Sequence, residues 1–193
     1  MEPVGNRRCA SPKEAPVRVR WSVRSSVTMS LRSLVRMDRA LGQWVRDVAT
    51  RGGVAAPLRV AGLALAPTFR GLLVALAVRR RTRPAAIEAV AASLLAAGAA
   101  RVLRDAIGRP RPGPRNDGGF PSRHAAAATA IAGSTGAHGI GVPVIGVAAA
   151  TGLLGRIIAG DHDPADIGAG VALGLFASVV CGAATRMLGA ARR

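Results

Sequence analysis

The strongest constraint in this sequence is a series of apolar segments, each close to the length of a membrane-spanning helix, separated by arginine-rich junctions. Residues 167–185 carry no charged side chain and approach the roughly 20 residues that a helix needs to cross a bilayer. Similar segments occupy 54–78, 84–107 and 125–155, and the last is broken into two short helices by the turn-forming residues 138–143. We therefore predict an all-α, multi-pass transmembrane bundle of about five spans.

The first of these segments, 54–78, is the weakest candidate span. It is interrupted by Arg59, Pro67 and Arg70. A central arginine in hydrocarbon is costly unless it faces the bundle or extends toward the membrane surface. In a membrane span, Arg59 and Arg70 would therefore have to face the bundle or extend toward the membrane surface.

The ends of the chain differ from the apolar segments. Residues 1–30 are polar and arginine-rich, which predicts a disordered basic tail without the apolar region of a cleaved signal peptide. In 31–53, apolar residues recur at helical spacing among arginines, which predicts an amphipathic interfacial helix, although a soluble surface helix fits the periodicity equally well. The transmembrane domain is expected at 54–186, and a basic C-terminal tail at 187–193.

Charge and composition narrow the class of protein. The chain carries 27 Lys and Arg residues against 10 Asp and Glu, and half of its residues are hydrophobic. Apolar spans joined by basic ends are typical of an inner-membrane protein. A nucleic-acid partner is disfavoured because aromatic residues are only 3% and the charge alternates with long uncharged stretches.

The distribution of arginines predicts a topology. One cluster of arginines, at 79–81 and 83, follows the first apolar segment, and a second cluster follows the last segment. The positive-inside rule assigns both clusters to the cytoplasm. The segments 104–124 and 156–166 then share the extracytoplasmic face of the plasma membrane. An odd number of spans brings the basic N-terminus to that face against the same rule, so either the amphipathic helix stays at the membrane surface or the first span is misassigned.

The first polar cluster follows the second apolar segment. Arg104 is expected on the last helical turn. Gly108 and the prolines after it then enforce an extended loop that carries Arg111. Guanidinium groups on a helix end and a rigid loop can hold a phosphate bidentately. A basic loop at the membrane edge would have the same composition, so both interpretations stay open.

The second cluster, Ser122-Arg123-His124, runs directly into an alanine-rich helix. Ser122 could simply cap this helix. A helix N-terminus also offers free N–H groups to an anion, and His124 there could exchange a proton near neutral pH.

The third cluster contains Arg156 at the end of one apolar run and His162 before another. Asp163-Pro164 is typical of a helix start, so Asp166 could be a first-turn acid favoured by the helix dipole. A carboxylate four residues after a histidine could also hydrogen-bond one ring nitrogen and leave the other nitrogen as a nucleophile.

Together the clusters resemble the three signature motifs of the type 2 phosphatidic acid phosphatase (PAP2) superfamily, which also includes bacterial acid phosphatases and vanadium haloperoxidases. The family motifs are Lys-x6-Arg-Pro, Pro-Ser-Gly-His and Ser-Arg-x5-His-x3-Asp, and their order and internal spacing agree with this chain over about residues 55–185. The matching residues are Arg104, Arg111 and Pro112, then Pro121, Ser122, Arg123 and His124, and finally Gly155, Arg156, His162 and Asp166.

The resemblance implies a role for each residue. His162 would attack phosphorus and form a phosphohistidine, Asp166 would orient it, and His124 would protonate the leaving oxygen. Such sites work without a metal because arginines supply the positive charge, so no cofactor is expected. The residues that would hold the phosphate oxygens are Arg104, Arg111, Ser122 and Arg156, with Arg123 as a further substrate-binding cation.

Three residues depart from the family pattern. Arg104 in place of lysine keeps the cation, and Gly155 in place of serine loses a hydroxyl. Arg123 replaces a glycine whose backbone amide binds phosphate. A non-glycine residue can still donate that amide when its φ is ordinary, and the Arg123 side chain could face a diphosphate.

The resemblance and the apolar spans together favour a membrane lipid phosphatase that acts on a phosphate ester or diphosphate of a polyprenyl or glycerol lipid. The alternatives are a broad-specificity phosphomonoesterase and a catalytically inactive PAP2-like membrane scaffold. A haloperoxidase is disfavoured because those proteins are larger and soluble. The sequence gives no indication of the oligomeric state.

Overall fold

The computed structural model describes residues 23–112 and 118–191, and within them every regular element is an α-helix. The prediction of an all-α protein is confirmed. The six helices are α1 (Val23–Arg51), α2 (Ala55–Val78), α3 (Arg83–Ile107), α4 (Arg123–Ala137), α5 (Val142–Ile158) and α6 (Pro164–Ala190).

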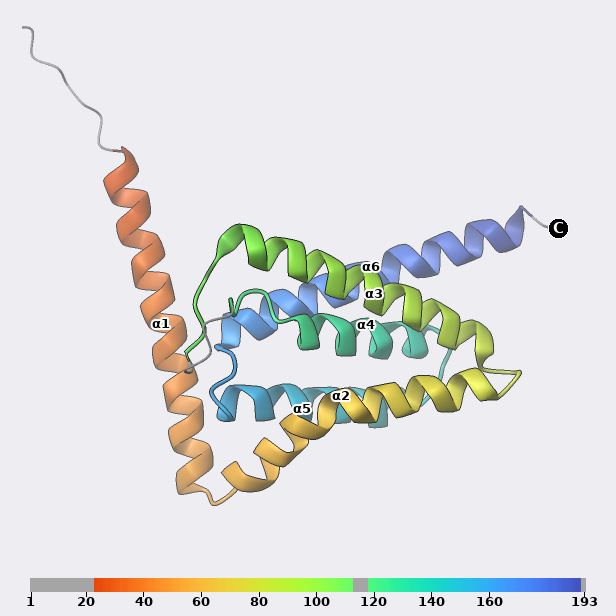
Figure 1. The fold of residues 1–193 in the computed structure, drawn as a ribbon, viewed down its shortest axis with the longest axis horizontal. Helices are drawn as coiled ribbons and strands as arrows, with labels where there is room; N and C mark the ends of the chain where they lie inside the picture. The colour runs from red at the N-terminus through yellow and green to blue at the C-terminus, as the bar shows by residue number, and fades with distance from the viewer. Residues whose placement is uncertain (1–22, 113–117, 192–193) are drawn as a thin grey trace, which may run out of the picture.

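Helices α2 to α6 form an up-and-down bundle, and α1 crosses one end of it (Figure 1). The short helix α4 packs against both α3 and α6, while α2 packs mainly on α5. Because successive helices alternate in direction, the end of α3, the start of α4, the end of α5 and the start of α6 meet beside α1. We call this the site end of the bundle and the other the opposite end.

Three of the helices, α2, α3 and α6, are long and apolar enough to cross a membrane. Helices α4 and α5 have 15 and 17 residues and correspond to the two short helices predicted for 125–155. The turn between them contains Gly139 and Gly141, which both have positive φ values. The bundle therefore reproduces the predicted order of apolar segments, with three full-length spans and two shorter helices.

The first and last helices extend beyond the bounds expected from the sequence. Of the predicted tail 1–30, residues 1–22 lie outside the described residues, whereas α1 already begins at Val23. No proline or glycine interrupts 23–41, so extension of an existing helix adds one hydrogen bond for each residue fixed. Likewise α6 continues to Ala190 through most of the predicted tail 187–193.

Helix α1 has two different apolar surfaces. Its contact with the bundle uses buried Gly42 and Ala49 and half-buried Val45. A second stripe is exposed and consists of Leu34, Met37, Leu41, Trp44 and Val48. This exposed stripe is what an interfacial helix requires, and the membrane-surface location remains a prediction.

Glycines bring the helices around the site into very close contact. A Cβ atom added at Gly155 of α5 would lie 2.0 Å from the carbonyl oxygen of Leu58 and 2.6 Å from the amide nitrogen of Gly62, both on α2. A Cβ added at Gly170 of α6 would lie 2.5 Å from the carbonyl oxygen of Ser122. Close backbone approach through small residues is a feature of membrane helix packing, and here it sets the separation of α5 from α2 and of α6 from the start of α4.

Candidate active site

His162 and Asp166 lie at the start of α6, at the site end of the bundle. His162 is only 2% exposed and Asp166 only 1%. Nδ1 of His162 is 3.6 Å from Oδ2 of Asp166, too long for a hydrogen bond but close enough for an ion pair with a protonated ring. The carboxylate therefore faces Nδ1, as the resemblance implies for a residue that orients the imidazole.

Asp166 also has the structural role considered for it. The Asp163 backbone N–H donates to Oδ2 of Asp166 over 3.0 Å, and the two residues form a capping box at the N-terminus of α6. The two interpretations are therefore compatible, because one carboxylate both caps the helix and faces the histidine. Burial and the charges of Asp38 and Asp166 raise the pKa of Asp163, against the opposing effect of Arg109 and Arg46.

Arg109 is a site residue that the sequence analysis missed. Its guanidinium donates to Asp38 of α1 and, over 3.2 Å, to Oδ2 of Asp163. Its Nη1 lies 3.4 Å from Oδ1 of Asp166, and its Cζ lies 5.9 Å from the centre of the Phe120 ring. Burial lowers the pKa of Arg109, but the hydrogen bond to Asp38 and the three carboxylates raise it overall. Arg109 is therefore a fixed cation that joins α1 to the base of the site.

Asp38 explains why α1 is held at the site end. One carboxylate oxygen accepts from Arg109, and the other accepts from the Ala165 backbone N–H over 2.8 Å. Gly42, one turn further along α1, would place a Cβ 2.9 Å from Oδ1 of Asp163. Sequence separation hid this contact, since Asp38 and Arg109 are 71 positions apart in the chain.

The loop between α3 and α4 folds back over the site through two adjacent glycines. A Cβ at Gly118 would lie 2.9 Å from Cγ of Arg104, and one at Gly119 would lie 3.1 Å from both Arg111 Cγ and Asp166 Oδ2. The Gly119 N–H donates to the carbonyl oxygen of Arg109 over 2.8 Å. The Gly118-Gly119 pair therefore allows the first motif to lie directly against the carboxylate of the third.

Ser122 is the N-cap of α4, as its position suggested. It is fully buried, and its hydroxyl oxygen accepts from the Ala125 N–H over 3.4 Å. Its own N–H donates to the carbonyl oxygen of Asp166 over 2.9 Å. The second motif is thereby tied to the third through the backbone.

His124 follows Ser122 in the first turn of α4 and is half-buried. It is close enough to the other motifs for their charges to act on it. Arg156, in the last turn of α5, is 9% exposed and donates from Nη1 to Oδ2 of Asp161 over 2.7 Å. All three motifs therefore converge, and the neighbours acting electrostatically on His124 are Arg156, Arg123, His162 and Arg111.

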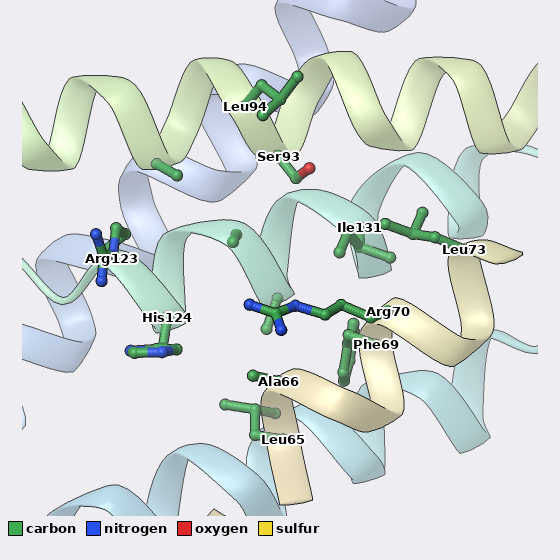
Figure 2. Close-up of a pocket in the computed structure, with 13 residues that line it drawn as sticks. Leu65, Ala66, Phe69, Arg70, Leu73, Ser93, Leu94, Arg123, His124 and Ile131 are labelled. Atoms are coloured by element: carbon green, nitrogen blue, oxygen red, sulfur yellow. The ribbon is translucent and has the colours of Figure 1, made fainter.

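A cavity of about 380 Å³ extends from His124 into the bundle between α2, α3 and α4 (Figure 2). Arg123 and His124 line it near the site end, and Leu65, Phe69 and Ile131 form its deeper apolar part. The arrangement can therefore accommodate an anionic group at the helix ends and an apolar chain beside it. Within the described residues, no three His, Cys, Asp or Glu side chains are grouped to hold a metal ion.

No protein-family model matches this chain, and no curated protein matches it either. Two solved structures are similar in fold. The transmembrane PAP2 type phosphatidylglycerolphosphate phosphatase of Bacillus subtilis aligns with a TM-score of 0.61 at 19% identity, over 80% of this chain and 87% of its own. Aquifex aeolicus LpxE aligns with a TM-score of 0.57 at 21% identity, over 74% and 92% of the two chains.

This chain has the fold of a transmembrane PAP2 phosphatase. The fold resemblance expected from the three motifs is therefore confirmed. One departure from the PAP2 motifs also has a structural reason. A side chain at Gly155, where the family has serine, would collide with α2.

Proposed function

We propose that this chain is a membrane lipid phosphatase that works through a phosphohistidine intermediate. The observation that carries the proposal is the buried His162 beside Asp166, at a bundle end where guanidiniums of three separate motifs gather. Fold similarity to a PAP2 phosphatase supports the same reaction class. The alternatives of a phosphomonoesterase with broad specificity and of an inactive scaffold are outcomes of the tests below.

In the proposed reaction, Asp166 holds Nδ1 of His162, and Nε2 attacks phosphorus. The bond from phosphorus to the leaving oxygen breaks, and His124 donates a proton to that oxygen. Water then attacks the phosphohistidine and releases inorganic phosphate. Arginines stabilise the charge on the phosphate oxygens in both steps. The arginines proposed to hold these oxygens are Arg104, Arg111 and Arg156, with Ser122 presenting the N-terminus of α4.

We assign the substrate to lipids because the cavity beside His124 has an apolar interior and is lined by α2 and α3, which are apolar enough to cross a membrane, together with α4. A polyprenyl or glycerol lipid phosphate would place its phosphate at the helix ends and its chain in this cavity. The exposed stripe of α1 would lie at the membrane surface beside the site.

We also propose that the site faces the extracytoplasmic side of the plasma membrane. The exposed arginines 79–81 and 83 are at the opposite end of the bundle, which the positive-inside rule assigns to the cytoplasm. A green fluorescent protein fused after residue 193 should then fluoresce, whereas an alkaline phosphatase fused there should be inactive. The reverse pattern would place the site in the cytoplasm.

The central experiment measures phosphate release by detergent-solubilised protein from polyprenyl diphosphate, phosphatidate and phosphatidylglycerophosphate. Wild-type protein should release phosphate in the presence of a chelator and be inhibited by vanadate, which mimics the transition state. A brief reaction with ³²P-labelled substrate, stopped in alkali, should leave acid-labile label on the protein. His162→Ala should lose both turnover and label while eluting as the wild type does in size-exclusion chromatography.

Several results would contradict this proposal. Unchanged turnover in His162→Ala would remove the assigned nucleophile. A strict requirement for Mg²⁺ would remove the metal-independent mechanism. Faster hydrolysis of water-soluble phosphate esters than of any lipid would favour the phosphomonoesterase, and no turnover with any substrate would favour the scaffold.

A further inference from the structure

Arg70 is a charged residue that none of the three motifs explains. It belongs to α2, one of the three helices with the length and apolarity of a membrane span, about two-thirds of the way from the site end. Among the described residues it has no ion-pair or hydrogen-bond partner. An unpaired arginine well inside a membrane-spanning helix is costly unless its side chain faces the bundle, reaches the membrane surface or meets a counter-charge.

The direction of the Arg70 side chain indicates where a counter-charge for its guanidinium would have to lie. Side chains on a helix tilt toward its N-terminus, and the N-terminus of α2 is at the site end. Figure 2 shows the Arg70 guanidinium reaching across the cavity toward His124. The charge is therefore directed into the cavity beside the site.

Arg123 adds a second cation to the same cavity. It occupies the first turn of α4, next to His124, and lines the cavity with Arg70. It too has no ion-pair or hydrogen-bond partner among the described residues. The cavity therefore combines an apolar interior with two guanidiniums from different helices, separate from the cluster around Arg109 and Asp166.

The position of His124 defines which part of a substrate meets these cations. In the proposed function His124 protonates the leaving oxygen, so the group that leaves with that oxygen occupies the cavity that His124 lines. A neutral lipid alcohol would leave both guanidiniums without a counter-charge. A leaving group with its own anion would compensate both.

We propose that Arg70 and Arg123 form a second anion subsite, which selects lipids that carry a further anionic group on the leaving side of the scissile phosphate. This inference rests on the proposed function, because it extends the same site. Two kinds of lipid have this chemistry. In a lipid diphosphate the second anion is the adjoining phosphate, and in a glycerophosphate lipid with two phosphates it is a more distant phosphodiester.

For a lipid diphosphate, the transferred group is the terminal phosphate. Nε2 of His162 attacks the terminal phosphorus, the bond from that phosphorus to the bridging oxygen breaks, and the bridging oxygen leaves with the lipid monophosphate. Arg70 and Arg123 then neutralise charge that develops on the leaving phosphate. Water converts the phosphohistidine to inorganic phosphate and restores the imidazole.

The test compares matched pairs of lipids in detergent. Farnesyl diphosphate is compared with farnesyl phosphate, and phosphatidylglycerophosphate with phosphatidate. For the wild type, kcat/KM should favour the member with the second anion in at least one pair. The pair that shows this preference distinguishes an adjoining phosphate from a distant phosphodiester.

Substitution of Arg70 supplies the decisive measurement. In Arg70→Gln the preference ratio for that pair should fall by about tenfold, the usual size of one lost charge-assisted hydrogen bond. Arg123→Gly, which restores the PAP2 residue, should lower the same ratio. The matched control is Arg59→Gln, which removes an exposed charge from the same helix outside the cavity and should leave the ratio unchanged.

Failure of this inference is distinguishable from failure of the proposed function. If wild-type protein hydrolyses these lipids with no preference for a second anion, or if Arg70→Gln slows both members of the pair equally, the subsite is refuted and the phosphatase stands. If wild-type protein hydrolyses none of them, both are refuted. Elution of Arg70→Gln as the wild-type species in size-exclusion chromatography ensures that a change in ratio is not misfolding.

Discussion

The bundle holds a histidine–carboxylate pair at each end, and the two pairs differ in surroundings more than in geometry. At the site end, His162 Nδ1 lies 3.6 Å from Asp166 on the same helix. At the opposite end, His138 Nε2 lies 3.2 Å from Oε2 of Glu88. Both carboxylates are buried, but the His138 side chain is 37% exposed and that of His162 only 3%.

The partners of the two carboxylates explain the difference. Glu88 of α3 contacts His138 after α4 and accepts from the Thr185 hydroxyl of α6 over 3.0 Å, so it ties three helices together. Asp166 lies beside half-buried Arg109, and guanidiniums from all three motifs act on His124 at the same end of the bundle. A buried histidine–carboxylate pair is therefore not sufficient for a phosphate site. Converging guanidinium groups distinguish the site end.

The largest difference between the two ends should appear in kcat when the carboxylate at each end is replaced by an amide. Asp166→Asn should lower kcat by about 10³- to 10⁴-fold, because an amide no longer stabilises the charged form of His162. Glu88→Gln should leave phosphate release within about twofold of wild type while lowering the apparent Tm in detergent. A loss of turnover in Glu88→Gln comparable to that in Asp166→Asn would abolish the distinction between the two ends.

The two ends should also differ in how well they accept a methyl group. Gly155→Ala would drive a Cβ into the backbone of α2, which cannot move aside cheaply, and should destabilise the fold by about 3 kcal/mol or more. Gly182→Ala at the opposite end would meet the flexible Glu88 side chain at 3.2 Å and should cost under about 1 kcal/mol. Thermal unfolding in detergent measures both, and equal losses would show that the tight α2–α5 crossing is not special.

A smaller effect should follow from loosening α1. Asp38→Asn removes a charged partner of Arg109 and weakens the contact with the Ala165 N–H, so kcat should fall about tenfold with little change in KM. Asp47→Asn, an exposed change on the same helix, is the control and should be neutral. If Asp38→Asn kept the kcat of the wild type, the contact between α1 and Arg109 would have no influence on turnover.

The smallest effect should be a pH-dependent change in stability at Asp163. Because its pKa is raised in the folded protein, its favourable contribution is complete below the ordinary value of 3.8 and is lost as the pH rises through the folded pKa. Asp163→Asn, which keeps a good helix cap, should therefore gain stability relative to wild type by a few degrees in Tm as the pH rises. If Asp163→Asn instead lost stability relative to wild type as the pH rises, the pKa of Asp163 would be lowered in the folded protein and not raised.

The sequence predicted most of the bundle because its signals are local. Apolar length located the helices α2 to α6, and the turn at 138–143 separated α4 from α5. Each motif lies at a helix end, so alternation of helix direction was enough to bring His124 and His162 to one end. The periodicity of apolar residues predicted helix α1 from residue 31. Its start at Val23 was missed because the polar, arginine-rich composition of the preceding residues favoured a disordered tail.

The supporting contacts could not be predicted in this way. The bond between Asp38 and Arg109 joins residues in different apolar contexts with no spacing rule between them. Gly62 and Gly155 are ordinary residues in apolar segments until the crossing of α2 and α5 is known. The Gly118-Gly119 doublet was the one available local signal, since adjacent glycines beside a basic motif often permit close backbone approach.

The crossing of α2 and α5 has a consequence for which side chains position 155 can carry. Serine there would bring its Cβ against the Leu58 carbonyl oxygen and the Gly62 backbone. A hydroxyl next to Arg156 is therefore compatible only with a wider spacing of these two helices, so the close packing that stabilises the bundle also limits which polar groups can be added to the site from α5.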